Sequence, residues 1–152
     1  MTRAEDVSVY TGECKTISEK KSSDLKNRAA MVNAIHPAIL VSIHQNHFSD
    51  AQYSGAQVFY ADSSDSRELA ERTQKLLRAA INPRNHREIK RAESVYLLKQ
   101  ICCPGILVEC GFLSNRQEEL MLQQEDYQKK MACVIAGAVT QFMQERNQYG
   151  EV

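Results

Sequence analysis

The stretch "ILVECGFLSN", residues 106–115, contains an apolar run that ends on a carboxylate, Glu109. Pro104 before the run and Gly111 after it are typical bounds of a short strand that is covered on both faces, as in a parallel sheet. We therefore expect Glu109 at the carboxyl end of a buried strand. Ligands of open α/β sheets bind beyond the carboxyl ends of the strands, so Glu109 is a candidate for chemistry. An ion pair with a nearby Lys or Arg fits the same position equally well.

Other strands and helices are expected around this one. A second apolar run, residues 39–43, ends on another ionisable group, His44, and residues 54–60 predict a third short strand. The polar segments 4–22 and 82–92 are predicted loops. Four helices are predicted. The first begins at a cap at Ser22, Ser23 or Asp24 and ends at about Asn33, and the second begins at a cap at residues 63–65 and ends at Ile81. A short helix begins at a cap at Ser114 or Asn115, and the last runs from about Asp126 to Gln144.

Strands that alternate with amphipathic helices predict an α/β fold, here one domain with a mainly parallel, twisted sheet and helices on both faces. A chain of 152 residues has the size of one domain. Its 19 Lys and Arg balance its 19 Asp and Glu, and no basic block occurs, so nucleic acid is not an expected partner. No apolar stretch has the length of a transmembrane segment, and the first ten residues lack the apolar core of a signal peptide.

The five cysteines do not form a Cys-x-x-Cys pair, and their odd number does not fit a disulfide framework. Cys133 is expected on the apolar side of the last helix, and Cys102 and Cys103 are expected to be small buried residues. Cys110 has a further interpretation as a thiolate nucleophile with His44 as its base.

If the strands that carry His44 and Glu109 are neighbours, the imidazole and the carboxylate share one site. Neutral imidazole is a common zinc ligand, and a carboxylate near a zinc-bound water can act as a general base. The sequence therefore indicates metal-assisted hydrolysis. His47 would add a second nitrogen, but in a polar loop it is expected to be a solvated side chain.

The segments "SIHQN", residues 42–46, and "PGILVECGFLSN", residues 104–115, closely resemble the zinc-dependent N-acetylmuramoyl-L-alanine amidases, particularly the sporulation and germination branch that acts on spore cortex. The initial "MTR" and "SGAQVFY" also resemble family segments, so the similarity covers essentially the whole chain. The resemblance implies that residues 1–152 form a catalytic domain that hydrolyses the amide between N-acetylmuramic acid and L-alanine in peptidoglycan. By similarity, Glu109 is the catalytic glutamate and His44 a ligand of one zinc ion. The family acts outside the membrane, in the cell wall or spore cortex.

The sequence departs from the family at its start. Family members begin with a strand that leads to a His-Gly-Gly segment and a metal-binding Glu, and neither occurs in this chain. We therefore expect an N-terminally incomplete domain that lacks the family's first strand and helix, and in which His44 holds zinc only weakly. The substitute ligands that the sequence offers are Asp6, Glu13, Glu19 and His47.

Loss of a strand would leave a sheet edge and apolar surface uncovered, which predicts self-association. The alternative to an active amidase is a non-catalytic form of the fold that binds muropeptide or a protein partner without turnover.

Overall fold

Strand β4 (Gly105–Phe112) lies inside the sheet and is buried along nearly its whole length. In the computed structural model it pairs with β1 (Leu40–Asn46) on one side and with β2 (Gln57–Tyr60) on the other, and β3 (Lys90–Arg91) completes the order β1-β4-β2-β3. The β1–β4 and β2–β3 pairs are parallel, whereas β2 runs antiparallel to β4. The predicted α/β class is confirmed, with a mixed sheet in which two of three pairs are parallel.

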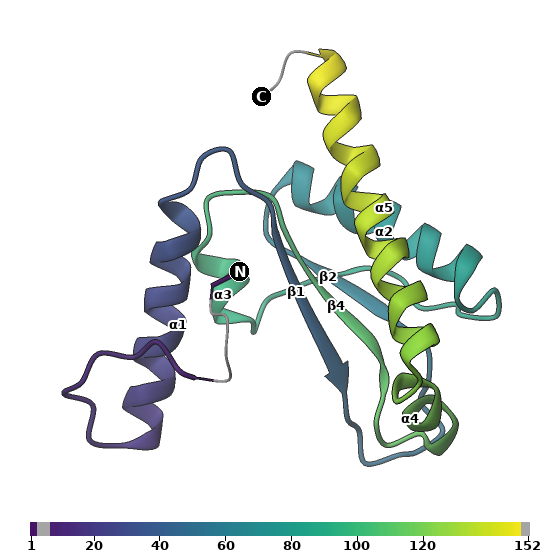
Figure 1. Ribbon diagram of the computed structural model, residues 1–152, viewed down its shortest axis with the longest axis horizontal. Coiled ribbons are helices and arrows are strands. Elements are labelled where there is room, and N and C mark those ends of the chain that lie inside the picture. The colour runs from purple at the N-terminus through teal and green to yellow at the C-terminus, as the bar shows by residue number, and fades with distance from the viewer. Residues whose placement is uncertain (3–6, 150–152) are drawn as a thin grey trace.

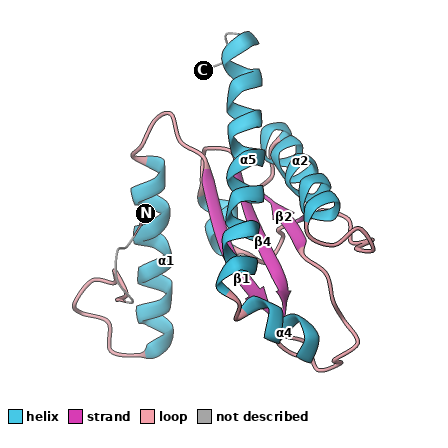
Figure 2. Ribbon diagram, turned by 45° about the vertical axis from the view of Figure 1, so that its right-hand side comes forward, coloured by secondary structure: helices cyan, strands magenta, loops and turns pink. Residues whose placement is uncertain are grey.

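The structure describes residues 1–2 and 7–149, and its helices lie on both faces of the sheet. Figures 1 and 2 show helices α2, α4 and α5 on one face and helices α1 and α3 on the other. None of the described helices combines the length and the apolarity needed to cross a membrane. The helices comprise α1 (Ile17–Asn33), α2 (Ser64–Ala80), α3 (Tyr96–Gln100), α4 (Arg116–Leu122) and α5 (Glu125–Tyr149).

Each face of the sheet packs against its own set of helices because side chains alternate along a strand. Ile106, Val108 and Cys110 of β4 belong to a buried cluster with residues of α2 and α5. Leu107 of β4 and Leu40 of β1 belong to a second cluster with residues of α1 and α3. We call these two faces the α5 face and the α1 face.

A β-bulge interrupts this alternation near the end of β4. His44 pairs with Glu109, but the next recorded pair joins Asn46 to Phe112, so β4 contains one residue more than β1 over this interval. Directly opposed residues point to the same face of a sheet. His44 and Asn46 both lie on the α1 face, and the bulge therefore brings both Glu109 and Phe112 to that face.

Helix α1 begins before the predicted position. Thr16 and Glu19 form a capping box: the Glu19 N–H donates to Thr16 Oγ1 (3.1 Å), and the Thr16 N–H donates to Glu19 Oε2 (2.8 Å). The prediction of a loop up to residue 22 is therefore wrong from Ile17 onward. Two of the expected caps instead hold the preceding chain, because Asp24 accepts a hydrogen bond from the Val9 N–H (2.8 Å) and Ser23 accepts one from the Thr11 N–H (3.1 Å).

The remaining helices follow the predictions more closely. The Ser63 side chain caps α2, and the Asn115 side chain caps α4 by accepting from the backbone of residues 117 and 118. Helix α5 is longer than predicted, and the segment 82–92 is a loop apart from β3. The short apolar segment "VYLLK", residues 95–99, overlaps helix α3.

Candidate active site

Glu109 and His44 lie side by side on adjacent parallel strands, as direct register partners. They occupy the α1 face, together with Leu40 and Leu107 further back along the same strands. The condition set by the sequence, that the strands carrying His44 and Glu109 are neighbours, is confirmed. The expectation that each ends its strand is wrong, because β1 continues to Asn46 and β4 to Phe112.

Glu109 carries a carboxylate oxygen that the fold buries but does not use. Its Oε2 atom is buried and has no hydrogen-bond partner within the part of the chain that the structure describes. Burial raises the pKa of this carboxyl group. The alternative of an ion pair with a Lys or Arg is not observed among these residues. An unpartnered, basic carboxylate is the arrangement expected of a proton acceptor rather than of a structural glutamate.

His44 lies on the outer strand of the sheet and is more exposed than Glu109. Its Nε2 atom is 2.8 Å from Ser42 Oγ, two residues earlier on the same strand. Partial burial lowers the pKa of His44, and the positive charge of Arg28 on α1 lowers it further. The imidazole is therefore neutral at pH 7, which is the form that binds a metal ion or accepts a proton.

A second polar group lies beside Glu109 on the β2 side. Gln57 is the register partner of Glu109 on β2, and its amide donates to the Glu88 carbonyl (2.8 Å) while it accepts from Arg87 (3.3 Å). The Arg87 guanidinium lies 4.5 Å from the ring centroid of Phe112. Sequence reasoning missed Gln57 and Arg87, because only the β2–β4 pairing brings them near Glu109.

Glu118 is a second buried glutamate at this end of β4, and it has a structural role. Its Oε1 accepts from the Gly55 N–H (2.7 Å), and its Oε2 accepts from the Phe112 N–H (2.8 Å). The spacing of Asn115 and Glu118 fits a capping box, but the Glu118 carboxylate instead joins the β1–β2 loop to β4. Gly111 permits this approach, because a Cβ there would lie only 3.2 Å from Glu118 Oε2.

The cysteine alternative is not supported. Cys110 is buried on the α5 face, opposite to His44 and Glu109, and burial together with the Glu109 charge raises its pKa to about 11. Such a thiol holds almost no thiolate at neutral pH. The expected burial of two other cysteines is wrong, because Cys102 and Cys133 are exposed, while Cys103 is half-buried.

The described residues do not form a complete zinc site. Within ranges 1–2 and 7–149, no three His, Cys, Asp or Glu side chains lie together as a metal centre would require. Catalytic zinc usually has three protein ligands, and His44 with Glu109 provides fewer. Glu19 is occupied in the α1 capping box, and Asp6 lies outside the described residues. Neither Glu13 nor His47 joins His44 in such a group.

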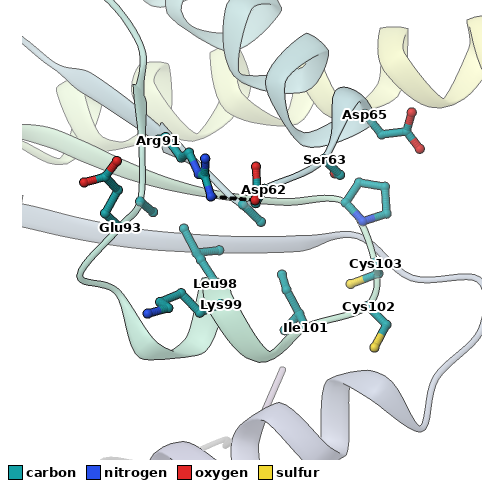
Figure 3. Close-up of a pocket in the computed structure, with 13 residues that line it drawn as sticks. Asp62, Ser63, Asp65, Arg91, Glu93, Leu98, Lys99, Ile101, Cys102 and Cys103 are labelled. Atoms are coloured by element: carbon teal, nitrogen blue, oxygen red, sulfur yellow. Dashed lines mark hydrogen bonds and ion pairs between the residues drawn. The ribbon is translucent and has the colours of Figure 1, made fainter.

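A cavity of about 550 Å³ lies at the opposite end of the sheet, where β4 begins. Figure 3 shows the Arg91–Asp62 ion pair, Lys99 and the neighbouring Cys102 and Cys103 around it. Because Pro104 precedes β4 and Glu109 lies well along it, this cavity is separate from the His44–Glu109 pair.

Comparisons with known proteins identify the family of this chain. A family model described as N-acetylmuramoyl-L-alanine amidase matches residues 1–141. The chain is 32% identical over 147 residues to a germination-specific N-acetylmuramoyl-L-alanine amidase of Bacillus subtilis, and the match covers 96% of this chain and 62% of that protein.

Two solved structures also match. The CwlD amidase of Clostridioides difficile, solved in complex with the GerS lipoprotein, has a TM-score of 0.88 and 39% identity, covering 94% of this chain and 74% of that one. An N-acetylmuramoyl-L-alanine amidase from Clostridium difficile 630 has a TM-score of 0.73 and 31% identity. That match covers 79% of this chain and 65% of the other. With the family model spanning nearly all of its length, the chain belongs to the N-acetylmuramoyl-L-alanine amidase family.

Proposed function

We propose that this protein hydrolyses the amide bond between N-acetylmuramic acid and L-alanine in peptidoglycan. The observation that carries the proposal is the buried, unpartnered Oε2 of Glu109 in direct register with His44. The Bacillus subtilis relative and the Clostridium difficile 630 structure are both named N-acetylmuramoyl-L-alanine amidases, and these names support the same reaction. The chain spans 62% of the length of the Bacillus subtilis relative. The activity of that longer protein is therefore a proposal for this chain.

In this proposal Glu109 acts as the general base. It removes a proton from a water molecule as the water oxygen forms a bond to the amide carbonyl carbon. The same carboxyl group then gives this proton to the L-alanine nitrogen as the carbon–nitrogen bond breaks, leaving a free amine and a lactyl carboxylic acid, which ionises in water. The raised pKa of Glu109 favours the first of these two proton transfers, because it makes the carboxylate a stronger base.

We also propose that the reaction depends on zinc, on the basis of the family resemblance. A bound zinc ion would polarise the carbonyl group and acidify water. Among the described residues, His44 is the side chain beside Glu109 that would ligate it, with the other ligands supplied from elsewhere. Zinc content of protein purified without added metal or histidine tags measures this directly, and we expect His44→Ala to lower it. Unchanged zinc in that variant would contradict the assignment of His44.

We further propose that the protein acts outside the membrane, in the cell wall or the spore cortex. The germination-specific relative supports the spore context. Digestion of purified cortex and of vegetative cell wall in parallel would separate the two, and we expect faster release of L-alanine amino termini from cortex. Equal rates on both substrates would contradict the spore-specific part alone.

The open edge of β1 supports a proposal of self-association. Ile43 on this edge is 60% exposed, and a groove of about 910 Å³ runs between β1 and α1, lined by apolar side chains that include Met31 and Ile35. A second copy of the chain that paired with β1 would cover this surface. Sedimentation should then detect a dimer, whereas a compact monomer at high concentration would contradict the proposal.

The decisive test of the activity is Glu109→Gln, assayed by the appearance of L-alanine amino termini from peptidoglycan. We expect turnover to fall about 10²-fold or more, because the amide cannot accept a proton. Glu119→Gln, on α4, is the matched control and should retain activity. Turnover of Glu109→Gln close to that of the parent would contradict the role of Glu109.

A parent protein that binds muropeptide but releases no amine would instead support the non-catalytic alternative. The limited set of metal-ligating residues around His44 is the observation that keeps this second function open. Binding of a muropeptide to the parent, measured by calorimetry alongside the turnover assay, distinguishes the two.

A further inference from the structure

Three aromatic rings lie in contact near the end of β4, and two of them are exposed. The ring centroids of Phe48 and Tyr53 are 4.8 Å apart in an edge-to-face arrangement, and those of Tyr53 and Phe112 are 6.3 Å apart and stacked. Phe112 is buried, but Phe48 is 50% exposed and Tyr53 is 42% exposed. We call these three residues the aromatic platform. Contiguous exposed rings are unusual on a protein surface and typically mark a binding site.

The loop that carries Phe48 and Tyr53 is held in place at several points. The Phe48 N–H donates to Ser114 Oγ (3.1 Å), and the Asn115 side chain donates to the Ala51 carbonyl (3.0 Å). The Gly55 N–H at the end of the loop donates to Glu118 (2.7 Å). A preorganised loop loses little conformational entropy when a ligand binds, so these anchors favour recognition.

Arg87 fixes the rings from behind. Its guanidinium lies 4.5 Å from the centroid of Phe112 and 5.7 Å from that of Tyr53, and its Nε donates to the Ser54 carbonyl (2.6 Å). The charge of Arg87 is thus directed at the protein's own rings and backbone. Phe48 and Tyr53 therefore present aromatic ring surface to solvent, with their two ring planes inclined at 77° to each other.

The platform is continuous with the candidate active site. The bulge in β4 places Phe112 on the same face as Glu109, three residues earlier, and Phe48 follows His44 by four residues. Gln57, the β2 partner of Glu109, accepts a hydrogen bond from the same Arg87 that stacks on Phe112. A substrate whose amide reaches Glu109 would extend over Phe48 and Tyr53.

We propose that the aromatic platform binds a pyranose ring of the glycan strand next to the amide that is cleaved. This inference rests on the proposed function, since it assigns a subsite for the glycan of that substrate. A pyranose has an apolar C–H face that can pack against the face of a single aromatic ring, and its rim of hydroxyl groups stays in water.

Binding of peptide-free glycan strands, alternating N-acetylglucosamine and N-acetylmuramic acid, tests the proposal without any need for turnover. We expect Phe48→Ala to weaken this binding about fivefold or more in calorimetry or NMR titration, as for other central aromatic contacts. Phe48→Leu keeps apolar bulk without a flat ring and should be nearly as weak. Tyr96→Ala is the matched control, because Tyr96 is 37% exposed on α3 at the other end of the sheet.

Two outcomes would overturn the proposal. The first is glycan binding by Phe48→Ala equal to that of the parent, or no glycan binding by the parent itself. The second is a loss of affinity for free stem peptide, but not for glycan, in the Phe48 variants. Because the titrations are repeated in a Glu109→Gln background, failure of the platform is distinguishable from failure of the proposed catalysis. Thermal denaturation of each variant verifies that the fold is unchanged.

Discussion

The two faces of the sheet differ in how they hold a glutamate carboxylate near the end of β4. On the α4 and α5 side, both oxygens of Glu118 accept backbone hydrogen bonds, from Gly55 and Phe112. On the α1 side, Glu109 has a buried oxygen with no partner among the described residues, beside an exposed outer strand. Glutamate thus stabilises a loop on one face and keeps a free carboxylate oxygen on the other. Two backbone hydrogen bonds and deeper burial distinguish Glu118 from Glu109.

The largest expected effect is the slow alkylation of Cys110, which is buried on the α5 face. Burial with a pKa of about 11 should make Cys110 react with iodoacetamide about a hundredfold or more slowly than Cys102 and Cys133 at pH 8. Mass spectrometry of the native protein at successive times measures the three rates. Labelling in denaturant is the control and should remove the difference. Equal rates in the native protein would show that this face is open and would weaken the comparison.

A large effect is also expected when the structural glutamate is removed. Glu118→Ala leaves two backbone N–H donors without their partner, so we expect the free energy of unfolding to fall by about 2–4 kcal/mol. Urea denaturation measures this change. Glu119→Ala on the same helix should change it by less than about 0.5 kcal/mol. Similar values for the two variants would mean that Glu118 is not the link between the loop and β4.

The smallest expected effect is an increase, not a decrease, in the free energy of unfolding. Glu109→Gln removes a charge that none of the described residues pairs, so we expect unfolding at pH 7 to cost about 1 kcal/mol more than in the parent. The folded-state pKa of Glu109 lies above the usual 4.5, so its protonated form favours the fold below pH 4.5, and this contribution is lost as the pH rises through the folded pKa. The advantage of the variant should therefore shrink at pH 4. A variant less stable than the parent at pH 7 would contradict an unpartnered carboxylate.

The central features of the site could be predicted from the sequence because they are local. The apolar runs before His44 and Glu109 indicate strands, and the caps at Ser63 and Asn115 are read from side chains next to the helices that they start. The Thr16–Glu19 capping box is local too, but it precedes a segment in which Ile17 is exposed, so the apolar pattern did not indicate a helix there.

The rest of the site depends on pairings between distant segments. The antiparallel direction of β2 brings Gln57 and Arg87 to Glu109, and no spacing in the sequence encodes that direction. The Glu118–Gly55 contact joins residues 63 positions apart. Cys133 was expected on the apolar side of the last helix, but it is exposed on α5. Such errors arise wherever tertiary packing, rather than local pattern, decides the side chain's environment.

The β-bulge between Glu109 and Phe112 acts as a phase shift in the strand. In a regular strand, two residues three positions apart point to opposite faces of the sheet. The single extra residue of the bulge brings Glu109 and Phe112 to the same face. Shortening β4 by one residue at Gly111 would therefore keep every side chain of the site and still separate the carboxylate from the rings. Function in this segment is sensitive to residue count as well as to residue identity, so a one-residue deletion there should be more damaging than most substitutions.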